Sequence, residues 1–408
     1  MLIRMKFEID QLVNEILDKL PEEVWTNPNT TFLDPSAGGG QFVKEIEKRL
    51  ISYGHKNVSN RVFGFFDSNI ELNYAKNKHS LNSQLFITSI DDIDNLISEK
   101  LNNMKFDVIV GNPPFQWSDE ESGKQRRNNR ENLWSRFLFK SYSLLKENGV
   151  FSLIIPSSWT SPSYDLGRKR VIDDIFKKHN VIYVDINNCS KYFPSQGSTF
   201  TFFVVEKSAL NNKKTPINIG SECIDIDFSS IDFLPSILDK NVFNISEKFF
   251  KDRKKLGMNN QLGLKLVGET FYKEHRRGFN VKAYHTASKT GWRFYSKKSD
   301  EHEKRKVLIS ISGRYSPLLD DEGNLSQTIM NMPYLLGDKE SGKYAIQVFN
   351  SKLYTFIIDK AYRYNGWINT RIISNLPALD FTRSWNDQQI YEYFNLTQEE
   401  IDYIEANV

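Results

Sequence analysis

The segment 106–115, with the sequence FDVIVGNPPF, constrains the fold most strongly, because a buried strand runs directly into a stiff corner. Residues 107–110 are mostly β-branched, which predicts a short strand inside a sheet. Asn112, Pro113 and Pro114 then force a turn, since each proline fixes its own φ angle and disfavours a helical residue before it. An ordinary strand-to-loop turn can have the same composition, so this motif alone does not determine a function.

The corner is well suited to a planar amino group. Prolines lack N–H donors, so we expect the side-chain oxygen of Asn112 and the carbonyl oxygen of Pro113 to point outwards at one position. The ring of Phe115 lies beside them in the sequence and can stack on a π system. These three residues are therefore the candidate catalytic residues.

A glycine-rich turn lies upstream of the corner. The strand 31–33 leads into Asp-Pro-Ser-Ala-Gly-Gly-Gly at 34–40, and apolar residues at helical spacing follow. Glycines allow close approach of a ligand, and free N–H groups at a helix start favour an anionic or polar group. A carboxylate at the strand end attracts an amine or a sulfonium, which favours S-adenosylmethionine over a dinucleotide. The candidate cofactor residues here are Asp34, Ser36, Gly38 and Gly40.

Acidic residues follow the next two predicted strands. The strand 61–66 ends at Asp67, which is placed to accept hydrogen bonds from a ribose, or to cap the following helix. The strand 85–88 leads to Asp91 and Asp92, and either carboxylate could receive the amino group of a cofactor adenine, although a plain loop is an equal interpretation. Asp91 is the residue that we assign to the cofactor.

The alternation of strands and helices predicts an α/β fold. A parallel, Rossmann-like sheet with helices on both faces would place all these residues at the carboxyl ends of its strands. Further strands are expected at 150–155, 181–186 and 200–205, and helices at 7–20 and from 133 to an end at Asn148-Gly149.

The motifs at 34–40 and 112–115 resemble those of the adenine-N6 DNA methyltransferases of restriction–modification systems. Their order, with the cofactor loop first, is similar to that of the gamma class. The resemblance implies S-adenosylmethionine as the cofactor, double-stranded DNA as the substrate and a flipped adenine that Asn112 and Pro113 bind and Phe115 stacks on. Residues 1–20 lack the Thr-Pro signature of this family, and Asp91 lies slightly out of the usual register.

A downstream loop adds to the resemblance. In the gamma class, an aromatic residue before a strand packs on the flipped adenine, and the segment 190–194, Ser-Lys-Tyr-Phe-Pro, precedes the strand 200–205. This implies a base-stacking role for Phe193, with a purely structural core residue as one alternative and Tyr192 as another.

The loop after the corner is basic. Lys124, Arg126, Arg127 and Arg130 could bind the phosphates that flank a flipped base, or could simply form a solvated surface.

Composition shifts after residue 207, so we expect a methyltransferase domain at 1–207 and a mixed α+β target-recognition domain at 208–408 with C-terminal helices. Cations and aromatic residues interleave at 271–277, 292–298 and 304–306, as at nucleic-acid surfaces. The segment 344–353 resembles recurrent segments of target-recognition domains.

The whole sequence sets limits on function. It has 408 residues, a net charge of +3 and two cysteines without metal-ligand spacing, so no metal is expected and DNA binding must depend on local patches. No signal peptide or membrane span is expected, which favours the cytoplasm of a bacterial, archaeal or phage-infected cell. A cognate restriction endonuclease is left open as a partner. The alternatives are an RNA adenine or protein glutamine methyltransferase, and a non-catalytic DNA-specificity module.

Overall fold

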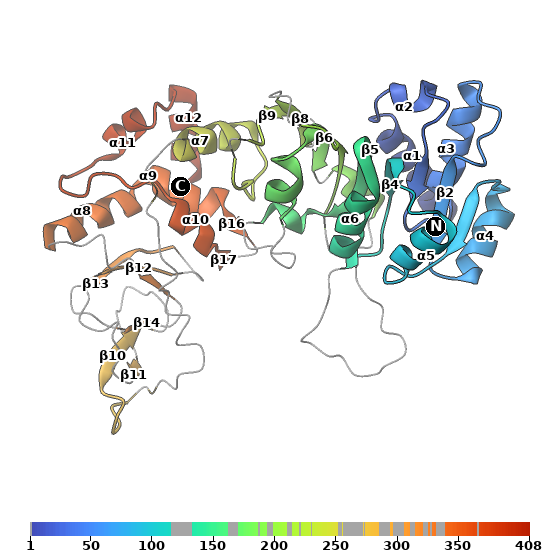
Figure 1. Ribbon diagram of the computed structural model, residues 1–408. Coiled ribbons are helices and arrows are strands. Elements are labelled where there is room, and N and C mark those ends of the chain that lie inside the picture. Colours follow the sequence, from blue (N-terminus) through green and yellow to red (C-terminus); the bar gives the residue numbers. More distant parts are fainter. Residues whose placement is uncertain are drawn as a thin grey trace. The chain divides into compact units, whose positions relative to one another are not determined.

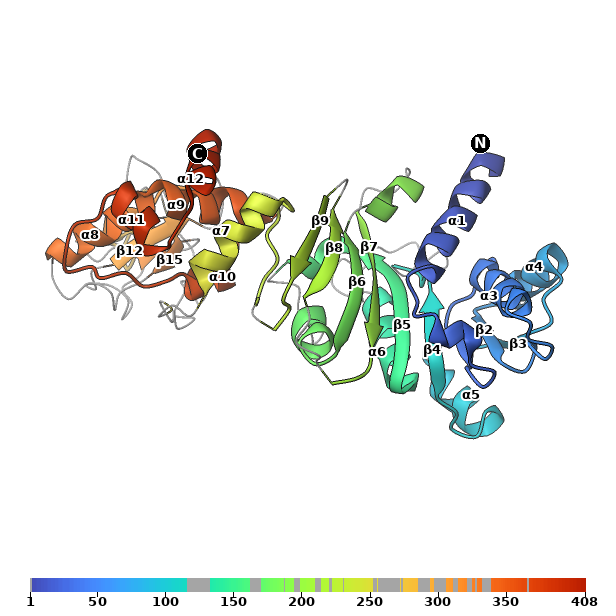
Figure 2. The ribbon, with the colours of Figure 1, turned by 90° about the horizontal axis from the view of Figure 1, so that it is seen from above.

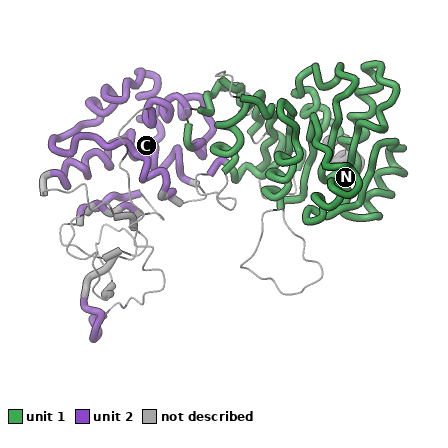
Figure 3. Tube along the Cα trace, in the orientation of Figure 1, with its two compact units in different colours: residues 1–159, 165–232 green, residues 160–164, 233–408 purple. Residues whose placement is uncertain are grey.

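The structure is a computed structural model of the chain, which divides into two compact units (Figure 3). Unit 1 comprises residues 1–159 and 165–232, and unit 2 comprises residues 160–164 and 233–408. The structure describes residues 2–115, 133–161, 170–186, 188–193, 199–209, 214–219, 222–229, 231–251, 255, 272, 274–284, 294–296, 306–310, 315–320, 325–326, 329–331, 339–364 and 367–408.

A sheet forms the centre of unit 1 (Figure 1). It has nine strands, in the order β3-β2-β1-β4-β5-β7-β6-β8-β9. The strands are β1 (Phe32–Asp34), β2 (Val62–Phe66), β3 (Gln84–Ile87), β4 (Phe106–Gly111), β5 (Leu145–Pro156), β6 (Asn180–Ile186), β7 (Phe200–Glu206), β8 (Thr215–Ile219) and β9 (Glu222–Ile226). The chain order reverses between β1 and β4, which is the switch point of a doubly wound sheet. The predicted α/β, Rossmann-like methyltransferase sheet is therefore confirmed.

The sheet is mixed rather than fully parallel. β1 to β5 pair in parallel, whereas β7 runs antiparallel to both β5 and β6. β6 and β7 are neighbours in sequence and pair without a crossover helix between them, so they take the antiparallel arrangement.

Helices cover both faces of the sheet, as predicted (Figure 2). They are α1 (Leu2–Leu17), α2 (Glu23–Thr26), α3 (Gln41–Ser52), α4 (Asn69–His79), α5 (Ile93–Lys100) and α6 (Leu133–Leu144), with the short turns η1 (Ser157–Thr160), η2 (Ile172–Phe176) and η3 (Asn188–Tyr192). Side chains of α1, α3 and α4 share one buried cluster with Val108 and Val110. Successive residues of a strand face opposite sides, and on the other side Phe151 contacts Tyr142 of α6.

The predicted end of the helix that begins at residue 133 is wrong. α6 ends at Leu144, and the Asn148-Gly149 pair lies within β5. Asn148 has a φ of 61°, and the pairing register between β4 and β5 shifts beside it. The left-handed residue therefore makes a bulge in a strand instead of capping a helix.

The first unit extends beyond the boundary predicted after residue 207. β8 pairs with β6 in parallel and β9 pairs with β8, so residues 215–226 continue the central sheet. The chain then passes into unit 2 after Asp232.

Unit 2 combines helices with short strands. Its elements are α7 (Lys240–Phe250), β10 (Val281–Tyr284), β11 (Phe294–Ser296), β12 (Lys306–Ser310), β13 (Leu318–Asp320), β14 (Leu325–Ser326), β15 (Ile329–Asn331), α8 (Lys339–Asn350), α9 (Lys352–Thr355), η6 (Phe356–Ala361), β16 (Arg363–Tyr364), β17 (Trp367–Ile368), α10 (Thr370–Asn375), α11 (Asp387–Tyr393) and α12 (Gln398–Asn407). Its core gathers around Phe249, whose ring packs on those of Tyr354 and Phe394. The segment 344–353 lies mainly in α8. Within the described ranges, no helix has both the length and the apolar character that crossing a bilayer requires.

Candidate active site

The glycine-rich loop and the proline corner touch each other. They follow β1 and β4, which are neighbouring parallel strands. A Cβ atom placed on Gly111 would lie 2.7 Å from Oδ1 of Asp34 and 3.2 Å from Cδ of Pro35, so only glycine leaves room for the carboxylate. The candidate cofactor loop and the candidate catalytic corner therefore form one site.

Asp34 is buried beside Gly111. Its side chain is 2% exposed, and Oδ1 accepts a hydrogen bond of 3.1 Å from the backbone N–H of Ser36. Burial raises the pKa of Asp34 to about 7, and the hydrogen bond from Ser36 opposes that rise. Among the described residues no cationic side chain pairs with it, so the carboxyl group is suited to receive a cationic group from a ligand.

The rest of the loop offers backbone groups. Gly38 and Gly40 have φ angles of 46° and 78°, which an L side chain rarely adopts, and a Cβ atom on Gly40 would lie 2.9 Å from Cβ of Ala75. No side chain caps α3, which starts directly after Gly40. Its first N–H groups are thus available to a polar or anionic ligand group.

Asp67 lies exposed at the carboxyl end of β2. Its backbone N–H donates to the carboxylate of Glu71 at 3.3 Å, and partial desolvation together with the charge of Glu71 raises the pKa of Asp67. Ser68, rather than Asp67, caps α4, because its hydroxyl accepts the N–H of Glu71 at 3.2 Å. The carboxylate of Asp67 is thus not used as a helix cap.

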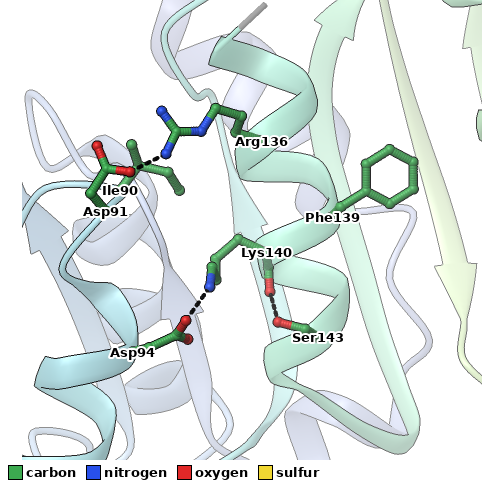
Figure 4. Close-up of a pocket in the computed structure, with 7 residues that line it drawn as sticks. All are labelled: Ile90, Asp91, Asp94, Arg136, Phe139, Lys140 and Ser143. Carbon is green, nitrogen blue, oxygen red and sulfur yellow. Dashed lines mark hydrogen bonds and ion pairs between the residues drawn. The ribbon is translucent and has the colours of Figure 1, made fainter. Parts of the chain in front are cut away.

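Both carboxylates after β3 have protein partners. Asp91 pairs with Arg136 of α6 (Figure 4), and Asp92 accepts the hydroxyl of Ser89 at 2.7 Å. A second pair, Lys140 to Asp94 at 2.5 Å, joins α6 to α5. Asp91 and Arg136 line a surface pocket together with Ile90, Asp94, Phe139, Lys140 and Ser143. The assignment of Asp91 to the cofactor stays a prediction, and sequence reasoning missed Arg136 as its partner.

Asn112 carries the most unusual polar atom of the corner. Its Oδ1 atom is buried and has no hydrogen-bond partner among the described residues. Leaving a buried acceptor unpaired costs about 1–3 kcal/mol, so this atom needs an explanation, and a ligand group that donates a hydrogen bond would provide one. Pro113 beside it is buried, and Phe115 is partly buried.

Three phenylalanine rings meet next to the corner. The ring centroids of Phe115 and Phe193 are 6.5 Å apart with an interplanar angle of 83°. Phe200 lies 4.6 Å from Phe115 and 4.8 Å from Phe193. Tyr192, the alternative to Phe193, is buried, and its hydroxyl donates to Glu15 of α1 at 2.5 Å. The structure therefore brings Phe193 to Phe115, and adds Phe200, which sequence reasoning missed.

Some predicted residues cannot be placed. Lys124, Arg126, Arg127 and Arg130 lie outside the described residues.

Within the described part of the chain, no group of His, Cys, Asp and Glu side chains could hold a metal ion.

Two curated methylases are similar in sequence. The modification methylase CviBIII of Paramecium bursaria Chlorella virus NC1A is 28% identical over 215 residues, which cover 49% of this chain and 53% of that protein. The type II methyltransferase M.BstVI of Geobacillus stearothermophilus is 26% identical over 164 residues, which cover 38% of this chain and 28% of that protein. The chain thus spans about half the length of the first relative and about a quarter of the second.

Solved structures match at lower sequence identity than these two methylases. The nuclease-deletion mutant of the type ISP restriction-modification enzyme LlaGI, in complex with a DNA substrate mimic, is 10% identical, with a TM-score of 0.48 over 85% of this chain and 50% of that one. The M protein of the type I restriction enzyme EcoKI is 14% identical, with a TM-score of 0.37 over 49% of this chain and 46% of that one.

The family model of the Eco57I restriction-modification methylases matches residues 40–193. This range includes the proline corner and Phe193, and it ends before the segment 233–408, which makes up most of unit 2. The resemblance of this segment to the restriction–modification methylases is thereby confirmed.

Proposed function

We propose that the chain is a DNA methyltransferase that transfers a methyl group from S-adenosylmethionine to the N6 amino group of a flipped adenine. The buried, unpartnered Oδ1 of Asn112 carries this proposal, because it lies in a corner that touches a buried carboxylate and whose Phe115 packs on Phe193 and Phe200. An exocyclic amino group would supply the missing hydrogen bond. The family match and the methylase relatives support the DNA methyltransferase part of this proposal, and the choice of adenine rests on the corner.

The residues of the loop after β1 fit this cofactor. Asp34 offers a buried carboxylate to a cationic group, and the uncapped start of α3 offers N–H groups to a carboxylate. The exposed Asp67 is available to ribose hydroxyls. When bound, the cofactor supplies a methyl group that its sulfonium already activates.

The corner makes the adenine amine a better nucleophile. In free adenine the lone pair of this nitrogen is delocalised into the ring. Hydrogen bonds from the amino group to Asn112 Oδ1 and to the Pro113 carbonyl draw the nitrogen towards tetrahedral geometry and localise that pair. Positioning and electrostatics then supply the catalysis without a strong base.

The aromatic rings account for base flipping. A base inside a duplex cannot reach a partly buried corner, so it must leave the stack, at a cost of a few kcal/mol. Phe115 and Phe193 are both partly buried and offer ring surface that offsets the lost pairing and stacking.

Unit 2 holds a turn that fits DNA. Residues 276–279 close a tight turn through two backbone hydrogen bonds between Arg276 and Phe279, of 3.2 and 2.9 Å. Arg276 and Arg277 are exposed, neither pairs with a carboxylate among the described residues, and the guanidinium of Arg276 stacks 4.1 Å from the ring centroid of Tyr272. Stacking stiffens an arginine and leaves its in-plane donors for phosphates or base edges. We therefore assign target recognition to unit 2, and a restriction–modification system as the setting.

Expression of the chain in a host without DNA methylation tests the proposal. Sequencing of the host genome should find N6-methyladenine at a defined site. The Asn112→Ala variant should leave no modified adenine while it still binds S-adenosylmethionine in isothermal titration calorimetry. A wild-type chain that binds the cofactor but methylates RNA, protein or cytosine instead of adenine in DNA would refute the proposal.

A further inference from the structure

We infer that Phe200 is a positioning residue that sets the angle between the two rings proposed to hold the flipped base. This inference rests on the proposed function and adds to it a residue that does not itself face the base. Phe200 is 1% exposed, whereas Phe115 and Phe193 are partly buried.

The three rings form a closed set of contacts. Phe200 lies 4.6 Å from Phe115 at an interplanar angle of 31°, and 4.8 Å from Phe193 at 54°. Phe115 and Phe193 meet each other only edge to face, at 6.5 Å and 83°. Phe200 is therefore the nearer neighbour of both rings, and its removal would let each of them turn.

Phe200 also fixes the backbone that carries Phe193. Its N–H donates to Oγ of Ser190 at 2.7 Å, and the carbonyl of the same serine accepts the N–H of Phe193 at 2.9 Å. Ser190 of η3 thus forms hydrogen bonds with the backbone of both Phe200, the first residue of β7, and Phe193.

The η3 segment is held at both of its ends. Asp185, which is 6% exposed, accepts the N–H of Cys189 at 3.2 Å at its start. Tyr192 donates to Glu15 of α1 at its end. Because the backbone of this segment is held, the freedom left to Phe193 is the rotation of its side chain, which the ring contact with Phe200 limits.

The strand offers a matched control. Phe203 lies three residues further along β7, is 0% exposed, and packs edge to face on Phe151 and Phe176 on the opposite side of the sheet. Phe203→Leu makes a core cavity in the same strand as Phe200→Leu, but it leaves the three-ring contact intact.

The test compares methyl transfer by Phe200→Leu and Phe203→Leu on two duplexes that carry the site found by sequencing. In one duplex the target adenine is paired, and in the other it faces an abasic position, so that no base pair must be broken. We expect Phe200→Leu to lower kcat about 10-fold on the paired duplex with KM for DNA changed less than about twofold, because weaker stacking lowers the flipped fraction. The abasic duplex should restore most of that loss, and the S-adenosylmethionine affinity should be unchanged.

The outcomes distinguish the positioning role of Phe200 from the proposed function of the chain. Equal losses for the two leucine variants, or a loss that the abasic duplex does not restore, would overturn the positioning role while the proposed function stands. A wild-type chain without activity on either duplex would overturn both. The Ser190→Ala variant tests the same role while it keeps the ring of Phe200. Its loss of kcat on the paired duplex should also be restored on the abasic duplex. A Ser190→Ala loss that is equal on both duplexes counts against the inference.

Discussion

The buried carboxyl group of Asp34 should make both stability and cofactor binding depend on pH. Its pKa rises from 3.8 to about 7 in the folded chain, because burial removes it from water. A difference of about three pH units corresponds to about 4 kcal/mol between the two protonation states, as an upper limit.

The sign of the stability effect follows from this raised pKa. Below about pH 3 the carboxyl group is protonated in both the folded and the unfolded chain and has no effect. As the pH rises to about 7, the unfolded chain loses the proton while the folded chain keeps it, so the free energy of unfolding falls. Asp34→Asn removes this effect and keeps an acceptor for the N–H of Ser36. In urea denaturation the variant should gain up to about 4 kcal/mol over the wild type at about pH 8, and nothing at about pH 3.

Cofactor binding should show the opposite trend. A cationic group of S-adenosylmethionine needs the ionised form of Asp34, so the Kd of the wild type should improve about tenfold per pH unit between about pH 5 and 7 and then level off. The Asp34→Asn variant should bind weakly, with no such slope. Isothermal titration calorimetry over this range measures both. A wild-type Kd that is constant from about pH 5 to 8, or a slope that survives in Asp34→Asn, would refute the role of this carboxylate.

Four further outcomes are expected. Asn112→Ala should abolish incorporation of labelled methyl groups into DNA at unchanged cofactor affinity, and full activity would remove its catalytic role. Asp67→Ala should raise the cofactor Kd about tenfold by loss of a charge-assisted hydrogen bond, and an unchanged Kd in calorimetry rejects the contact with ribose. Arg276→Ala and Arg277→Ala should each lower the salt slope of DNA binding in gel-shift titrations by about one, and an unaltered slope contradicts a phosphate contact. Gly111→Ala should cost about 1–3 kcal/mol in the free energy of unfolding, because the added methyl group would lie 2.7 Å from a carboxylate oxygen, and an unchanged melting temperature would argue against that crowding.

The corner after β4 and the glycine turn after β1 could be predicted from the local sequence, because each depends on the residues at the end of one strand. A β-branched run followed by Gly111 and two prolines places a corner at the end of β4, whatever the rest of the chain does. The glycines at 38 and 40 adopt the positive φ angles of the turn between β1 and α3, which an L side chain rarely adopts. The contact between the two loops then follows from the strand order, since β1 and β4 are neighbours in a doubly wound sheet.

Features that depend on pairing across the fold could not be predicted in this way. Arg136 lies in a helix with an ordinary amphipathic pattern, and only the packing of α6 beside α5 brings it to Asp91. Phe200 looks like any buried strand residue, because its contacts come from two loops that are far apart in sequence. An Asn-Gly pair after an amphipathic segment is typical of a helix end, so the sequence predicts a cap at Asn148. The pairing of β4 with β5 places this left-handed residue inside a strand instead.

The choice between Tyr192 and Phe193 illustrates how a neighbouring helix determines which ring faces the site. In a 3₁₀ turn such as η3, successive side chains differ in direction by about 120°, so adjacent residues cannot share a face. The hydroxyl of Tyr192 is fixed by Glu15 of α1, and its ring is buried against that helix. Phe193 is then the aromatic residue that turns to Phe115 and Phe200. The sequence motif leaves both aromatics available, and the hydroxyl group that only tyrosine carries decides between them, since a buried tyrosine needs a hydrogen-bond partner for its hydroxyl and the partly exposed Glu15 of α1 provides one.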